Sequence, residues 1–290
     1  MTMSSQDLPS SASRPRRLLR PLTALTLATA LTSGSVAAVQ LISVKDEIQI
    51  GQQAQAEISQ QVPKLSDAAT RRYVEGLGKR LAQHASGADY PYSFTVANQS
   101  DMNAFALPGG PVWINRGIIE AASHEAQVAG VMAHEIAHVA QRHSAQQLTK
   151  ATVANGLLGL LGAAIGNDSG AGGAAARAVA GFTANSFMLK FSRDDEREAD
   201  REGVRIMQRA GYDPRGLVEF MGLLAAQQQR NPGAVEQFLS THPAPAERVE
   251  ELQRDTATLP AGGARDSAQF QQVKARLREL PPAPAPATRR

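Results

Sequence analysis

The spacing of apolar and polar residues predicts a mostly helical α+β fold. Apolar residues recur every three or four positions in some segments, as on the buried face of a helix, and alternate with polar residues in others, as in a strand. In the first half of the chain the predicted helices cover residues 45–62 and 67–84, and the predicted strands cover 92–98, 103–107 and 112–115. The last two strands flank Pro108-Gly109-Gly110, which predicts a hairpin or two adjacent strands.

Small and apolar side chains occupy most of residues 128–140, which predicts a buried helix with Ser123 as its N-cap. Another helix is predicted from Ser192, because Asp195 three residues later completes a capping box. Pro214 predicts the start of a further helix. Near the end of the chain, the apolar face of a short amphipathic helix consists of Phe270, Val273, Leu277 and Leu280. The proline-rich residues 281–290 are expected not to pack.

The buried helix contains the sequence HEIAH, which is typical of a metal site. His134 and His138 are four residues apart, so they lie about 40° apart on one face of a helix and can converge on one ion. Glu135 follows directly, where a carboxylate can take the proton of an attacking water. The alternative is an ordinary helix that carries histidines by chance. A preorganised metal centre needs a helix held inside a core, as this one is expected to be.

A third ligand is expected on another element, because a catalytic zinc commonly takes three protein ligands and keeps one position for water. The charge-rich helix after Ser192 supplies Glu196 and Asp200, four apart on one face. We assign Glu196 to the metal and Asp200 to the spare N–H of His134, where it fixes the tautomer. Glu198 lies about 200° from Glu196 on the helix and points away. A solvated start of a helix is the alternative.

These residues resemble the gluzincin metalloproteases related to the CAAX prenyl endopeptidase, and most of all the periplasmic branch that includes BepA and LoiP. The resemblance covers roughly residues 43–253. Three further stretches agree with it: NAFALPGGPVWINRGII, AGYDPRG and STHPAPAERV. It implies a zincin-like fold with one zinc ion per chain, bound by His134, His138 and Glu196, and with Glu135 as the catalytic base. The chain lacks the C-terminal helical repeat domain of BepA, so partner recruitment by such a domain is not expected.

Composition and charge define the expected domains. With 42% hydrophobic residues in 290, the chain can bury one core, the expected protease domain over residues 39–258. Residues 1–38 resemble a signal peptide, with a retained anchor or a mitochondrial presequence as alternatives. They hold four of the 30 basic and one of the 27 acidic residues, so the remainder is balanced and nucleic-acid binding has no support. The absence of cysteine argues against a lipoprotein.

Two further segments have more than one interpretation. Residues 151–191 form an insert rich in alanine and glycine, whose uncharged run of roughly 17 residues is too short for a membrane span. It is either core packing or a lid or plug over the cleft with peripheral membrane contact. The strand with Asn103, Ala104, Phe105 and Ala106 is either a substrate-binding edge along the cleft or a structural hairpin.

Two further histidines complete the candidate chemistry. His143 lies about 140° around the helix from His138 and should miss the metal. His242, within THPAP, is either a turn residue, a donor to the oxyanion of the reaction, or a cap on the metal in a resting state.

The sequence therefore predicts a secreted, periplasmic zinc endopeptidase, and the resemblance implies that it acts on unfolded or misassembled proteins in quality control. The rival is a chaperone-like, client-binding protein whose zinc is structural or capped. The presence of Glu135 argues against this rival, because a protein that only binds does not need a catalytic base. A membrane-embedded peptidase is disfavoured, because only the leader and the insert approach the length of a span.

Overall fold

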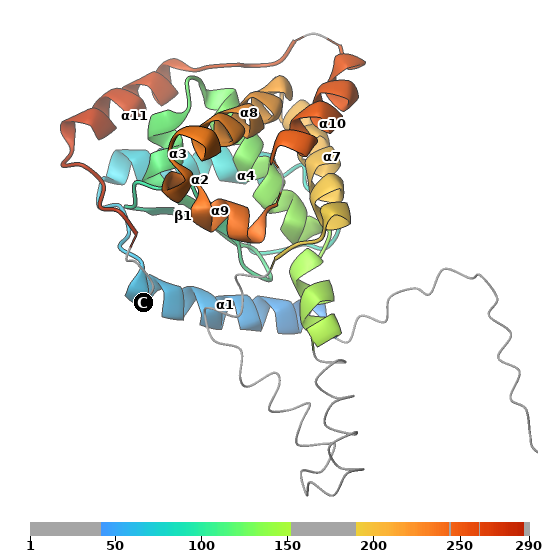
Figure 1. The fold of residues 1–290 in the computed structure, drawn as a ribbon. Coiled ribbons are helices and arrows are strands. Elements are labelled where there is room, and N and C mark those ends of the chain that lie inside the picture. The colour runs from blue at the N-terminus through green and yellow to red at the C-terminus, as the bar shows by residue number, and fades with distance from the viewer. Residues whose placement is uncertain (1–41, 152–189, 244, 261, 287–290) are drawn as a thin grey trace, which may run out of the picture. The chain divides into compact units, whose positions relative to one another are not determined.

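The computed structural model describes residues 42–151, 190–243, 245–260 and 262–286. Helices dominate these residues, and a single three-stranded sheet accompanies them (Figure 1). The α+β class with few strands is therefore confirmed. The predicted leader and nearly all of the predicted insert lie outside the described residues. Within the described ranges, no helix combines the length and the apolar character that crossing a membrane requires.

The predicted elements begin and end close to their predicted positions. The helices over residues 116–121, 143–151, 236–241 and 245–257 and the 3-10 helix over 232–234 were not predicted. In chain order the labelled elements are α1 (Val44–Gln61), α2 (Ala68–Ala82), β1 (Ser93–Ala97), β2 (Ala104–Ala106), β3 (Pro111–Asn115), α3 (Arg116–Ala121), α4 (Glu125–Ala140), α7 (Arg193–Arg209), α8 (Arg215–Arg230), η2 (Pro232–Ala234), α9 (Glu236–Thr241), α10 (Pro245–Ala257) and α11 (Ala268–Glu279).

The sheet has the strand order β1-β3-β2, so β2 is an edge strand. β3 pairs in parallel with β1 and antiparallel with β2, where Ala104 lies opposite Ile114. The hairpin between β2 and β3 turns through Gly109 and Gly110, whose φ angles of 73° and 122° favour glycine. A Cβ atom on Gly109 would come within 2.5 Å of the Cα atom of Ile48 in α1. Glycine therefore allows this turn to press against α1.

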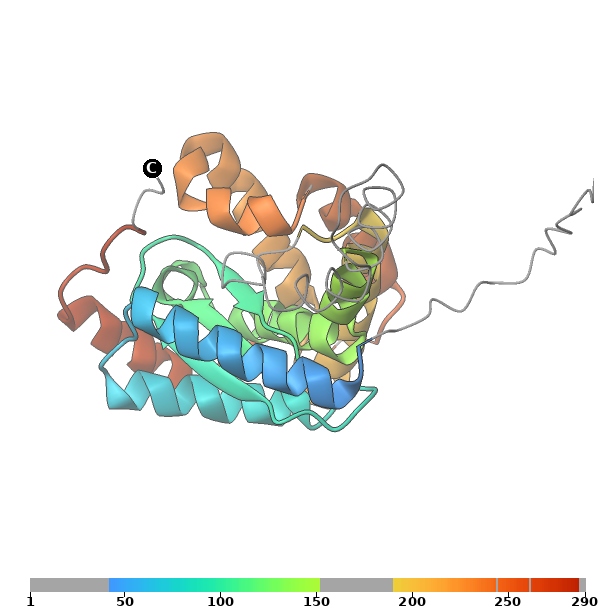
Figure 2. The same cartoon turned by 90° about the horizontal axis from the view of Figure 1, so that it is seen from below.

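Both faces of the sheet are covered, because alternate residues of β3 enter different clusters. Val112 and Ile114 join the main core together with residues of α2 and α4. Trp113 points to the opposite face and packs with Ala54 and Ile58 of α1. Figure 2 shows α1 alongside the strands. The sheet is thus a middle layer, and Trp113 is fully buried within it.

α4 is buried along its whole length, as its small and apolar residues predicted. The prediction that Ser123 is its N-cap was wrong. The helix begins at Glu125 with His124 as N-cap, so Ser123 lies one position too early. The Ser123 amide instead donates to the side chain of Gln127 at 2.7 Å. The side chain of Gln127 therefore provides the acceptor near the helix start.

The C-terminal part of the chain packs on this core. Phe270 and Leu277 of α11 are fully buried, as their helical spacing predicted. The following proline-rich residues were expected not to pack, and this was wrong for the first residues of that segment. The amide of Ser100 donates to the carbonyl of Pro284 at 2.9 Å, and the Arg116 guanidinium donates to the carbonyl of Pro281 at 2.8 Å. Proline has no backbone N–H to donate but keeps its carbonyl oxygen, and both contacts use this oxygen as the acceptor.

Asp67 links the start of α2 to α11. Its carboxylate accepts from the amide of Thr70 at 2.9 Å, and the Arg276 guanidinium donates to its other oxygen. Burial raises the pKa of Asp67, but the Thr70 and Arg276 bonds outweigh it, so the pKa lies below its ordinary value. The ionised form of Asp67 is therefore favoured by folding.

We expect Asp67→Ala to lower the free energy of unfolding at neutral pH by about 1–2 kcal/mol, the value of an N-cap. Because the folded pKa is depressed, this contribution is present above the unfolded pKa of about 3.9 and is lost as pH falls through the folded pKa. Urea unfolding at several pH values measures it. Asp89→Ala, at an exposed position, serves as the control. If the difference in unfolding free energy between the parent and Asp67→Ala stays constant down to acidic pH, the carboxylate is not its cause.

Candidate metal centre

Four side chains from three segments converge in the interior. His134 and His138 come from α4, Glu196 comes from the first turn of α7, and His242 directly follows α9. One possible ligand atom from each lies within 4.8 Å of all the others, and all four residues are buried. The Nε2 atoms of His134 and His138 are 3.0 Å apart, and Glu196 Oε1 lies 3.4 Å from His138 Nε2. The helical spacing therefore brings together the residues that it predicted.

A glycine allows α7 to approach α4 at this point. A Cβ atom on Gly203 would lie 3.3 Å from the backbone nitrogen of His134, closer than most side chains tolerate. Asp200 and Glu196 lie one and two turns before Gly203 on the same face of α7. The close helix contact therefore holds both carboxylates against α4. The predicted capping box of Ser192 and Asp195 is present at the start of α7.

Asp200 lies where it was predicted, beside His134. Its Oδ1 is 3.0 Å from His134 Nδ1, which leaves Nε2 of His134 to face the other donors. Arg248 from α10 holds the same carboxylate in a two-pronged pair, at 2.8 Å from Nε and 2.6 Å from Nη2. Burial raises the pKa of Asp200, but Arg248 and His134 outweigh it and lower the pKa to about 2. Asp200 is therefore ionised and accepts the N–H of His134.

Glu135 is fully buried beside the four donors. Its Oε1 lies 3.6 Å from Nε2 of His242, and neither of its carboxylate oxygens has a hydrogen-bond partner among the described residues. A buried carboxylate without partners is costly. A cation bound by the neighbouring donors would offset this cost.

His242 lies inside the donor cluster and not in a solvent-exposed turn. Its Nδ1 is 2.9 Å from Glu196 Oε1 and 3.4 Å from His134 Nε2. The ring of Phe238 stacks on it at a centroid distance of 4.6 Å. The turn-residue interpretation is therefore the weakest of the three. The other two interpretations, an oxyanion donor and a cap, both require this position.

The donor set fits a divalent metal ion. Neutral imidazole nitrogens and a carboxylate are the ligands that zinc takes when cysteine is absent. Burial holds the pKa of His138 well below its ordinary value, so that its ring is neutral. Burial raises the pKa of Glu196, but Arg248 and His242 outweigh it and hold this pKa well below the ordinary range. A cation among these atoms would offset the lone pairs that face one another.

The predicted substrate-binding residues lie beside the site helix but outside the donor cluster. Asn103, Ala104 and Ala106 are buried, while Phe105 is half-buried and stacks on Trp113 at 6.0 Å. β2 contacts α4 and is an edge strand. Any contact with an extended peptide would therefore use the backbone of β2 more than these side chains.

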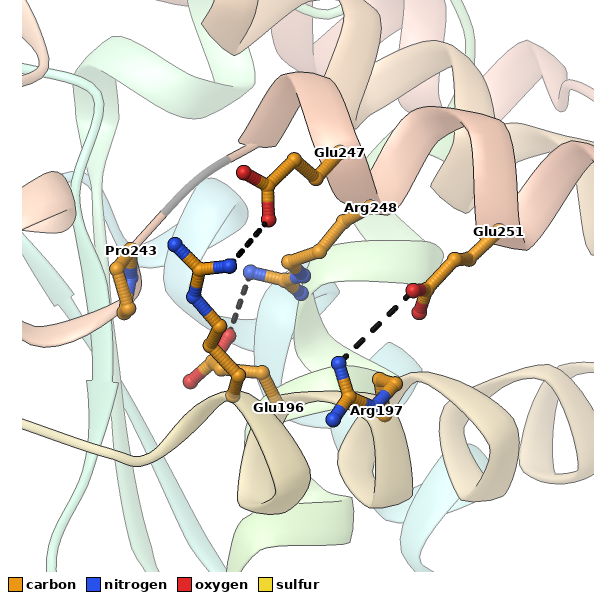
Figure 3. A pocket seen from close by; sticks show the side chains of 7 residues that line it. Glu196, Arg197, Pro243, Glu247, Arg248 and Glu251 are labelled. Carbon is orange, nitrogen blue, oxygen red and sulfur yellow. Dashed lines mark ion pairs between the residues drawn. The ribbon is translucent and has the colours of Figure 1, made fainter.

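A small pocket opens between α7 and α10, directly above Glu196 (Figure 3). At its base Arg248 reaches from α10 to Glu196, with 2.5 Å between Nη1 and Oε2. Two outer ion pairs join the same helices, with 3.0 Å between Arg193 and Glu247 and 3.9 Å between Arg197 and Glu251. The pocket is lined by Arg193, Glu196, Arg197, Pro243, Glu247, Arg248 and Glu251.

Comparison with known proteins agrees with this geometry. Residues 68–256 match the family model for peptidase family M48. The chain belongs to peptidase family M48. The predicted resemblance to gluzincin proteases of the BepA-like branch is thereby confirmed.

Three M48 relatives illustrate the similarity. The beta-barrel assembly-enhancing protease of Escherichia coli K12 is 31% identical over 240 residues, which are 81% of this chain and 49% of the relative. The mitochondrial metalloendopeptidase OMA1 of Saccharomyces cerevisiae is 36% identical over 156 residues, 52% of this chain and 43% of the relative. The metalloprotease YcaL of Escherichia coli K12 is 30% identical over 183 residues, which are 60% of this chain and 68% of the relative. The chain thus spans about half the length of the assembly-enhancing protease.

Two residues of the site in this M48 chain, Arg248 and Phe191, were not predicted from the sequence. Arg248 lies on the buried face of α10, which otherwise consists of Pro245, Leu252 and Thr256. An arginine on a buried helix face needs a charged partner, so this spacing was an available signal. Phe191 stacks on His138 at 4.0 Å, and its amide donates to the carbonyl of Thr241 at 3.1 Å. No local pattern reveals that contact.

We expect Asp200→Asn to weaken zinc affinity by about 10-fold to 100-fold, the range for groups that orient a metal ligand. The neutral amide is a poorer acceptor for the N–H of His134 and leaves Arg248 with one fewer buried negative partner. Competition with a chromophoric chelator measures the affinity. Asp194→Asn is the matched control, because Asp194 is an exposed carboxylate on the same helix. Equal affinities of the two variants would exclude Asp200 as the partner of His134.

Proposed function

We propose that the chain is a zinc-dependent endopeptidase that hydrolyses peptide bonds of proteins. The observation that carries the proposal is the buried convergence of His134, His138, Glu196 and His242 beside the Glu135 carboxylate, which has no hydrogen-bond partner among the described residues. Membership of peptidase family M48 supports the same activity. In this proposal His134, His138 and Glu196 hold one zinc ion per chain.

The residues of the chain divide the chemistry among them. When bound, zinc supplies Lewis-acid polarisation of the scissile carbonyl and lowers the pKa of a water toward about 7. Glu135 takes the proton of the attacking water and then passes it to the leaving amine. Asp200 keeps the proton of His134 on Nδ1, and Arg248 keeps both Asp200 and Glu196 ionised. The buried position of these groups excludes bulk water from the proton transfer.

The substrate would be an extended segment of another protein. The edge strand β2, with Asn103, Ala104, Phe105 and Ala106, lies beside α4 and can add a peptide strand through its backbone. Pairing through the backbone reads little sequence, which suits unfolded or misassembled proteins. The name of the beta-barrel assembly-enhancing protease agrees with a role in protein quality control.

We assign this role to the periplasm. The basic and then apolar character of residues 1–38 supports export, and the absence of cysteine argues against a lipid-modified form. The structure describes none of these leader residues, so the assignment rests on sequence.

A chaperone-like protein with a capped zinc site is the second candidate. The observation in its favour is His242, which completes a set of four donors and would leave no position for water. The Glu135 carboxylate, to which no described residue makes a hydrogen bond, favours the peptidase, because a closed structural site needs no base. A cap that moves away from the metal would reconcile the two observations.

We expect Glu135→Gln to retain about one zinc per chain and to lose proteolysis, because Glu135 is a base and not a ligand. Metal analysis and cleavage of casein by the purified chain test both parts. Glu250→Gln, at an exposed position of α10, is the control and should cleave normally. Cleavage by purified Glu135→Gln would refute the assigned role.

We expect His242→Ala to keep zinc and to raise basal cleavage, including self-cleavage during expression, because it removes the fourth donor. If His242 instead only stabilises the oxyanion, turnover should fall by about 10² to 10³. Initial rates on casein, together with the zinc content, separate these outcomes. Unaltered activity would contradict both roles.

A further inference from the structure

His143 lies outside the donor cluster, as predicted, but it lies beyond the end of α4, so the predicted angle on a continuous helix does not apply, and it directly contacts a proposed ligand. Its Nδ1 is 2.9 Å from Nδ1 of His138, and its side chain is fully buried. α4 ends at Ala140, and Arg142 adopts a φ of 60°, a left-handed conformation that is uncommon outside glycine. The chain then enters the next helix at residue 143. This turn brings His143 back alongside His138.

The short distance between the two Nδ1 atoms restricts where the protons lie. Two N–H groups cannot face each other at 2.9 Å, and neither can two lone pairs, so one proton occupies the gap. His138 Nε2 faces the other donors, 3.0 Å from His134 Nε2. A neutral His138 that offers the Nε2 lone pair to a metal keeps its proton on Nδ1. Among the described residues, the Nδ1 atom of His143 is placed to accept this proton from Nδ1 of His138.

The same reasoning extends one group further. If Nδ1 of His143 accepts, its proton lies on Nε2, which is 3.5 Å from Glu198 Oε2. Glu198 is half-exposed at the surface of α7, where its carboxylate can receive this N–H. We propose that His143, supported by Glu198, is a positioning residue that sets the tautomer and orientation of His138. This inference rests on the proposed metal site.

The two histidines of HEIAH would then be oriented by different chemistry. His134 donates to the buried carboxylate of Asp200, whereas His138 donates to a neutral imidazole. A carboxylate raises the basicity of a ligand more than an imidazole does. Glu198 acts through His143 and is partly solvated, so its loss should matter less than the loss of His143.

The test measures zinc affinity by competition with a chromophoric chelator, in the Glu135→Gln chain so that self-cleavage does not interfere. We expect His143→Leu to weaken affinity by about 10-fold to 100-fold. His143→Asn should stay within about threefold of the parent, because its amide oxygen can take the place of Nδ1 as acceptor. Glu198→Gln should give a smaller loss than His143→Leu. Asp194→Asn, an exposed carboxylate on α7, is the matched control and should match the parent.

Two results would overturn the proposal. A zinc affinity of His143→Leu equal to that of the parent would show that His138 needs no such acceptor. An equal loss of zinc affinity in His143→Asn and His143→Leu would show that His143 contributes only through packing. If His143→Leu does not fold, the tautomer of the His143 ring tests the proposal instead. Long-range ¹H–¹⁵N spectra of the zinc-loaded Glu135→Gln chain should show His143 protonated on Nε2, and a proton on Nδ1 would refute the proposal. Failure of the parent to bind zinc would instead refute the proposed function.

Discussion

The constraint on which this structure depends is the convergence of lone pairs at the junction of α4 and α7. Imidazole nitrogens of His134, His138 and His242 and a carboxylate oxygen of Glu196 face one another inside the protein, where little water can screen them. Such an arrangement is unfavourable for the protein alone and becomes favourable with a cation at its centre. It also requires rigid support, since each donor would otherwise turn away from the others.

Buried charge supplies much of that support. The Arg248 guanidinium contacts both Glu196 and Asp200, so one cation of the protein serves two carboxylates of α7. A buried ion pair adds little net stability, but removing one partner leaves a costly unpaired charge. Arg248 therefore ties the position of α10 to the ionisation of the site. Because His242 lies only six residues earlier, the segment that carries this histidine is anchored by the same contact.

The outer contacts of α10 have a different character. The pairs of Arg193 with Glu247 and of Arg197 with Glu251 lie near the surface, where ion pairs contribute at most about 1 kcal/mol. The His242 segment is held not only by Arg248 but also by the contact of His242 with Glu196 and by the bond from the Phe191 amide to the Thr241 carbonyl. The sheet is covered on both faces and presents β2 as an edge. A buried helix and a covered sheet therefore give the site a fixed support.

The sequence by itself determined most of the strands and longer helices and indicated three of the four donors. Helical spacing placed His134 with His138, and Glu196 with Asp200, because these relations depend only on 3.6 residues per turn. The strands and the turn at Gly109 also followed from local patterns, because the alternation of a strand and the glycine preference of a turn depend only on neighbouring residues. The predicted start of α4 was wrong by one position, because the Gln127 side chain provides an acceptor near the helix start that no capping pattern shows. Only the tertiary structure decided that His242, Arg248 and His143 reach the site, since their contacts join segments far apart in the sequence or depend on a left-handed turn. Local periodicity specifies which face of a helix a residue occupies, whereas packing decides what that face meets.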